Sequence, residues 1–137
     1  MDQKAIDSLV EPAYEILNEV GIAKGGKVSK SYRAQISTFG SAIINGTLLS
    51  AVSFFSTQGD ASVDRSKLME AIKLIINKDN KDDKDDKDDK ETLFEYVKKN
   101  TPDVGENRQL KAKIMYAAIA LKLAMNLYQL SGEEPAE

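Results

Sequence analysis

Apolar residues recur every three or four positions along most of the chain, a spacing that predicts helices. In residues 2–20 the repeat consists of Ile6, Leu9, Val10, Ala13, Ile16, Leu17 and Val20. This segment is expected to form an amphipathic helix that ends at Gly21. Pro12 lies inside it and removes one backbone hydrogen bond, which predicts a kink or a division into two shorter helices. Residues 23–29, with Gly25-Gly26 flanked by lysines, are predicted to be a mobile basic loop.

One long, largely buried helix is predicted over residues 31–56. Its periodic positions are Tyr32, Ile36, Phe39, Ile43, Gly46, Leu49 and Val52. Several β-branched residues leave a strand as the alternative, but the spacing of three and four favours the helix. Gly40 and Gly46 each cost about 1 kcal/mol relative to alanine inside a helix, which predicts close approach of a neighbouring helix.

A third helix is predicted to begin at a cap, Ser62 or Asp64, and to end near Asn77. Its core positions are Leu68, Ile72, Ile75 and Ile76. The next segment, KDNKDDKDDKDDK, contains no apolar residue and cannot join a core. We therefore predict a mobile charged loop over residues 79–90. A calcium loop needs a glycine at its sharp turn, and this repeat has none, so a specific metal site is disfavoured.

Two further helices complete the predicted bundle. Leu93, Phe94, Tyr96 and Val97 indicate a short fourth helix, followed by a turn at Thr101-Pro102 and Gly105. The segment 107–130 has no proline or glycine and is apolar around most of its circumference, which predicts a helix at the centre of the bundle. Residues 131–137 form an acidic tail. The predicted fold is an all-α, single-domain bundle of five or six helices over residues 1–137.

The composition excludes most catalytic chemistry. The chain has neither histidine nor cysteine, so acid–base catalysis would fall to carboxylates that cluster in water-exposed segments. The motifs GxxxxGK[ST], GxSxG and HExxH are absent. We expect no enzyme, no catalytic residue, no metal site, no cofactor and no small-molecule substrate. The absence of cysteine, of a secretory signal and of a long apolar run predicts a soluble cytoplasmic protein without membrane contact.

Charge is distributed unevenly along the chain, although its net value is only −3. The first helix, the Lys/Asp repeat and the tail are acidic, whereas residues 20–59 and 107–132 contain no acid. A polar stripe is predicted on one side of the last helix, shared with Met115 and Ala118. It consists of Arg108, Lys111, Lys122, Asn126 and Gln129. Such a stripe indicates either a solvated surface with extended lysines or a contact for a polyanion.

The segment KVSKSYRAQISTFGSAIINGTLLSAVSFF, residues 27–55, resembles the small subunit of the type III-B CRISPR-Cas effector, the Cmr complex. The shared features are a basic lead before Tyr32 and Arg33, the pair Asn45-Gly46, and the apolar run 48–55. The resemblance covers most of the chain outside the Lys/Asp repeat. It departs at Phe39-Gly40, where members often have Leu-Pro, and in the last helix, which lacks a tryptophan in its aromatic and basic cluster.

The resemblance implies a non-enzymatic helical domain of antiviral defence. Its copies would stack end to end in a minor filament, beside other subunits of the Cmr complex, along the groove where target RNA pairs with guide RNA. Base pairing would read the sequence, so this subunit would contact only the RNA backbone. The expected phosphate contacts are Lys27, Lys30, Arg33, Arg108, Lys111, Lys113 and Lys122. Two alternatives are a helical protein–protein adaptor without RNA contact and the small subunit of the related type III-A effector.

Overall fold

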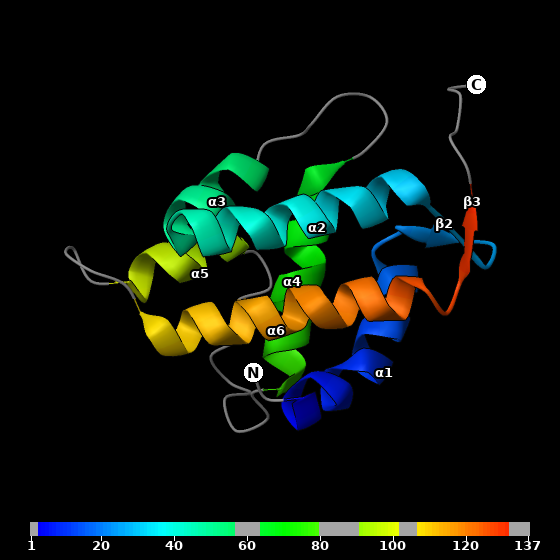
Figure 1. Ribbon diagram of the computed structural model, residues 1–137, viewed down its shortest axis with the longest axis horizontal. Coiled ribbons are helices and arrows are strands. Elements are labelled where there is room, and N and C mark those ends of the chain that lie inside the picture. The colour runs from blue at the N-terminus through cyan, green and yellow to red at the C-terminus, as the bar shows by residue number, and fades with distance from the viewer. Residues whose placement is uncertain (1–2, 57–63, 80–90, 102–106, 132–137) are drawn as a thin grey trace.

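The computed structural model describes residues 3–56, 64–79, 91–101 and 107–131, and within these ranges it contains six helices and one small sheet (Figure 1). The helices are α1 (Gln3–Glu19), α2 (Lys30–Asn45), α3 (Leu48–Phe55), α4 (Arg65–Asp79), α5 (Leu93–Lys99) and α6 (Arg108–Met125). The strands are β1 (Ala23–Lys24), β2 (Lys27–Ser29) and β3 (Gln129–Ser131). The predicted all-α bundle is confirmed, with the sheet as a small addition at one end.

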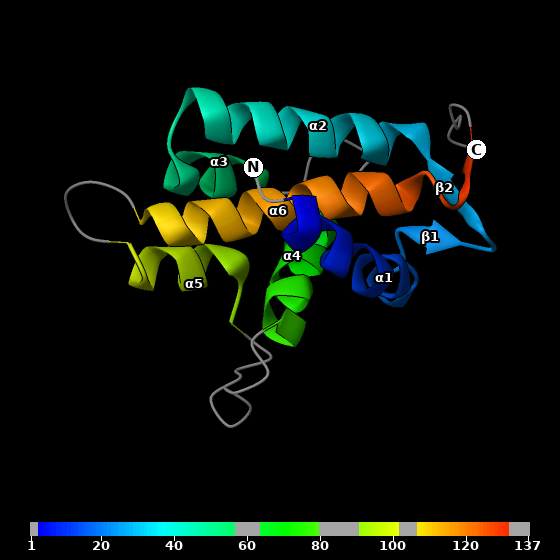
Figure 2. The same ribbon diagram turned by 60° about the horizontal axis from the view of Figure 1, so that its bottom comes forward.

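Helix α6 is the central element, because α1, α2 and α4 all pack against it (Figure 2). Its buried side chains face several directions around the helix, as its sequence predicted. They are Leu110, Ile114, Ala117, Ala118, Ala120, Leu121, Ala124 and Met125. Four of these are alanines, whose small side chains let neighbouring helices approach. The predicted end of this helix was too late, however, because α6 stops at Met125 and the chain continues into β3.

Helix α1 follows its apolar repeat closely. Ile6, Leu9, Ala13, Ile16 and Leu17 are all buried, and the helix runs without interruption from Gln3 to Glu19. Of the kink or division predicted at Pro12, the division into two helices is therefore wrong. Packing of the apolar stripe against α6 and α4 holds the helix together across the missing hydrogen bond.

The predicted helix over residues 31–56 consists of two helices, and the strand alternative is wrong. Helix α2 ends at Asn45, and the Oγ1 atom of Thr47 accepts a hydrogen bond from the Ser50 amide at 3.1 Å, which caps the start of α3. Gly46 therefore marks a break, and a Cβ there would lie only 3.2 Å from the Ala42 carbonyl oxygen. Gly40 does face α6, but its Cβ would meet Met115 Cε at an ordinary 3.8 Å, so no unusually close approach requires it.

Helix α4 has the predicted core positions, and α5 forms where the short fourth helix was predicted. Asp64 caps α4, because its Oδ1 atom accepts from the Ser66 amide at 3.1 Å, while Ser62 lies outside the described residues. Helix α4 extends two residues beyond the predicted end at Asn77. Of the predicted loop 79–90, Asp79 ends α4 and the rest lies outside the described residues, as do the turn at Pro102 and Gly105 and the tail after Ser131.

The segment predicted as a mobile loop forms a β-hairpin instead. Strands β1 and β2 pair antiparallel, and β2 also pairs parallel with β3. Gly25 and Gly26 have positive φ angles of 58° and 79° and connect the two strands as a two-residue turn. Ala23 and Val28 are buried beneath it. Chain segments about a hundred residues apart therefore meet at one end of the molecule.

Candidate nucleic-acid interface

The hairpin brings two lysines together across its strands. Lys24 on β1 and Lys27 on β2 are directly paired residues, and both side chains are exposed. Opposed residues in antiparallel strands have Cβ atoms about 5 Å apart, and like charges at this distance disfavour the fold. A bound anion would relieve that repulsion, which makes this end of the molecule a candidate for polyanion contact.

Arg33 contacts the end of α6, and this contact places Arg33 and Lys122 at the same end of the molecule as the hairpin. The Nε–H of Arg33 donates to Asn126 Oδ1 at 2.8 Å, and Lys122 lies one turn before Asn126 on the same helix. One of the five N–H donors of the guanidinium is therefore used inside the protein. Lys122 also has an ordinary structural role, because a cation in the last turn of a helix opposes the negative end of the helix dipole.

Lys30 lies at the first position of α2, where the helix dipole adds positive potential to that of its side chain. Ser29 caps this helix, since its Oγ accepts from the Ser31 amide at 3.1 Å. The first turn contains no acidic residue, although acids are the residues that favour this position. The electrostatics at the start of α2 therefore favour a negatively charged partner.

The structure adds two lysines that the sequence did not single out as contacts. A Cβ built on Gly21 would lie 3.5 Å from Lys67 Nζ and 4.0 Å from Lys24 Cε, so these two side chains converge beside the end of α1. Lys67 comes from the first turn of α4. We call the group Lys24, Lys27, Lys30, Arg33, Lys67 and Lys122 the basic end.

Several carboxylates in the described ranges are engaged elsewhere. Glu15 and Glu19 of α1 pair with Lys78 at 3.8 and 3.9 Å, and Asp64 binds the amide and hydroxyl of Ser66. Within the described part of the chain, no carboxylate lies within ion-pair distance of the six cations of the basic end. Their positive charge is therefore not neutralised by these acids.

Three of the seven predicted contacts lie away from the basic end. Arg108, Lys111 and Lys113 belong to the first two turns of α6, and Arg108 is about 20 Å along the helix from Lys122. Lys113 lies on the opposite side of α6 from Lys111, beside Ala5 and Ile76. The expected stripe is also not continuously exposed, because Ala118 in its middle is buried. The seven residues thus do not form one surface.

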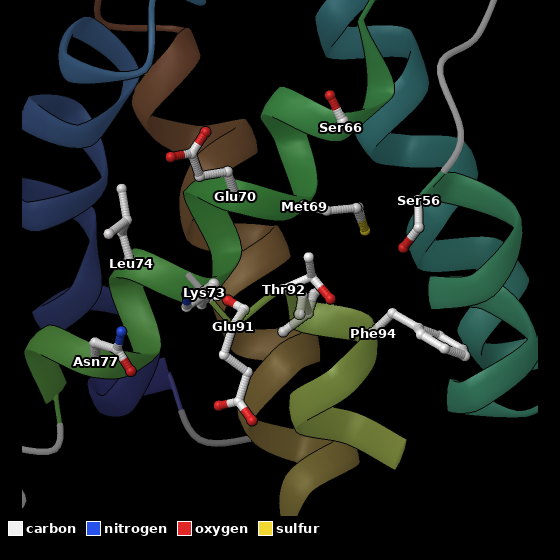
Figure 3. Close-up of a pocket in the computed structure, with 11 residues that line it drawn as sticks. Ser56, Ser66, Met69, Glu70, Lys73, Leu74, Asn77, Glu91, Thr92 and Phe94 are labelled. Carbon is white, nitrogen blue, oxygen red and sulfur yellow. Dashed lines mark hydrogen bonds between the residues drawn. The ribbon is translucent and has the colours of Figure 1, made fainter. Parts of the chain in front are cut away.

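A separate cavity of about 690 Å³ lies between α4 and α5 and reaches Ser56 at the end of α3 (Figure 3). Lys73 of α4 is only 8% exposed, and its Nζ donates to the carbonyl oxygen of Glu91 just before α5. The Glu91 carboxylate accepts from Lys99 at 2.9 Å. These contacts join α4 to α5 and give Lys73 a structural role. Among the described residues, no three acidic side chains gather closely enough to hold a metal ion.

Comparisons with known proteins give no relative from which a role could be transferred. No protein-family model, no curated protein and no solved structure matches the chain. Within the described ranges, no helix has both the length and the apolar character needed to cross a bilayer.

Proposed function

We propose that this chain is the non-catalytic small subunit of a type III-B CRISPR-Cas ribonucleoprotein, the Cmr complex, and that its basic end contacts the phosphate backbone of RNA. The observation that carries the RNA contact is the gathering of six cations from five elements, with no carboxylate in the described ranges at ion-pair distance. The assignment to the Cmr complex follows from the resemblance of residues 27–55. The helical architecture agrees with it.

The arrangement of the basic end suits contact with a backbone more than recognition of bases. All of its cations except Arg33 are lysines, whose ammonium groups are point charges on flexible stems. Such groups neutralise phosphates but do not distinguish one base from another. Base pairing between guide RNA and target RNA would supply the sequence specificity in such a complex. Arg108 and Lys111 would form a second, separate contact at the other end of α6.

The RNA contact is tested by the salt dependence of affinity. Fluorescence anisotropy of a labelled single-stranded RNA is measured against salt for the wild type and for Lys27→Glu/Lys30→Glu, which changes two exposed side chains. Each lost phosphate contact lowers the slope of log affinity against log salt by about 0.7, so a fall of about 1.4 is expected. Lys4→Glu/Lys98→Glu carries the same charge change elsewhere and serves as the control. An unchanged slope in the first variant removes these lysines from the interface.

The assignment to the complex is tested separately. The tagged chain is purified from its host, and the bound proteins and RNA are identified. Backbone subunits of a type III-B effector are the expected partners, and those of a type III-A effector would support the related alternative. RNA binding by neither the isolated chain nor the assembled complex would instead support a protein–protein adaptor.

A further inference from the structure

A second surface of this molecule has the opposite character to the basic end. Of the five exposed large apolar side chains in the described part of the chain, Tyr14 of α1 and Leu127, just after α6, line one surface, and Leu123 lies four residues before Leu127. Leu127 is 63% exposed, Leu123 39% and Tyr14 38%. Exposed apolar clusters on a folded domain commonly mark places where another molecule binds.

Tyr14 and Leu127 border a shallow, open groove of about 550 Å³ with an acidic rim. Val10, Tyr14 and Leu127 form its apolar lining, and Asp7 and Glu11, one turn apart on α1, lie along its edge. The residues that line this groove include no lysine or arginine, and Lys4, one turn before Asp7, is not among them. The groove therefore combines apolar surface with negative charge.

The wall of the groove is held in a fixed position. The rings of Tyr14 and Tyr128 stack with centroids 4.4 Å apart and an interplanar angle of 16°, and Tyr128 Oη donates to the Tyr14 carbonyl oxygen at 2.7 Å. This contact joins α1 to the segment between α6 and β3. A surface that is ordered before binding loses less conformational entropy when a partner arrives.

We propose that this groove binds a cationic amphipathic helix of a partner protein. Its apolar lining would receive the apolar side of the helix, and Asp7 and Glu11 would pair with lysines or arginines along the edge. The proposal concerns a protein partner and does not depend on RNA binding at the basic end.

The test uses a model ligand. A fluorescent peptide of about 18 residues, built from leucine and lysine with helical spacing, is titrated with the protein, and a second peptide carries glutamate in place of every lysine. We expect the lysine peptide to bind the wild type and the glutamate peptide not to bind. Glu11→Lys/Leu127→Ser should weaken it about tenfold, since it removes one apolar contact and reverses one rim charge. Glu70→Lys/Ile44→Ser, a matched change of charge and exposed apolar surface elsewhere, should bind as the wild type does.

Three outcomes would overturn the proposal. Equal binding of the two peptides would show that charge does not select the partner, and equal weakening by both double variants would show that the peptide binds the acidic protein nonspecifically. Sedimentation showing a wild-type dimer that Leu127→Ser dissociates would assign the groove to a second copy of this chain. Circular dichroism of each variant verifies its fold, and methyl resonances of Leu123 and Leu127 in the wild type, which should shift on peptide addition, provide a test independent of mutation.

Discussion

Arg33 near the start of α2 donates from Nε to the Oδ1 atom of Asn126, which caps the end of α6, at 2.8 Å. The two residues are 93 positions apart in the chain. This hydrogen bond couples the central helix to the helix that carries Lys30, so part of the basic end depends on it for its geometry.

The contribution of this pair can be measured by a double-mutant cycle. Arg33→Ala and Asn126→Ala should each destabilise the fold, and their coupling free energy should be about 0.5–1 kcal/mol, because the bond is charge-assisted but exposed. Urea denaturation of the wild type, both single variants and the double variant gives the value. Strictly additive effects of the two substitutions would mean that the hydrogen bond adds nothing to stability.

Two substitutions of Gly25, in the turn of the hairpin, should differ in their effect on stability and on RNA binding. Gly25 has a φ angle of 58°, which asparagine adopts readily and valine does not. Gly25→Val should lower stability by about 1–2 kcal/mol and weaken RNA binding, since Lys24 and Lys27 would lose their fixed positions. Gly25→Asn should stay close to the wild type in both thermal denaturation and RNA anisotropy. If valine is tolerated as well as asparagine, the turn does not constrain the lysines.

Lys73 should matter for stability because it is buried. Lys73→Met keeps most of the side-chain stem but removes the ammonium that donates to the Glu91 carbonyl, and a loss of about 1–3 kcal/mol is expected. Lys99→Met removes the surface pair with Glu91 and should cost at most about 1 kcal/mol. Chemical denaturation compares the two variants. The opposite order of stability would show that the contact between α4 and α5 depends on the outer pair.

Ionisation of the Tyr128 phenol should lower the stability of the fold at alkaline pH. Burial, and after it the neighbouring Tyr14, raise the pKa of the Tyr128 phenol above its ordinary value of 10.0. The unfolded chain therefore releases this proton at lower pH than the folded protein, so the contribution is complete below pH 10.0 and is lost as pH rises through the folded-state pKa. Absorbance titration should show one late-ionising tyrosine that is missing in Tyr128→Phe. An identical titration of the variant would contradict the assignment.

Helices whose apolar spacing was continuous could be predicted from sequence, because burial of one helical face is a local property of the pattern. This holds for α1, α4 and α5. The division between α2 and α3 was missed because the apolar repeat continues across it. Thr47 could have indicated it, because threonine is a preferred N-cap residue and its side chain accepts from the Ser50 amide three residues later. The hairpin was missed for another reason, since strands of two or three residues are too short to show alternation.

The candidate interface was only partly predictable for a related reason. Lys27, Lys30 and Arg33 are neighbours in sequence, and a count of local charge finds them. Lys67 lies between Asp64 and Glu70, so a count of local charge does not single it out. Only the packing of α4 against the end of α1 brings it close to Lys24. The pairing of β3 with β2 is equally nonlocal, and no sequence pattern indicated which residues would meet there.

The parallel pairing of β2 with β3 also affects biosynthesis. Lys27 pairs with Gln129, a residue that the ribosome adds about a hundred residues later. A nascent chain whose hairpin has already emerged still lacks both the third strand and Asn126, the residue that accepts the hydrogen bond from Arg33. Long-range pairings of this kind form slowly, because a long stretch of chain must close on itself first. The basic end therefore takes its final form only when residues 126–131 have been synthesised and have paired with residues 27–33.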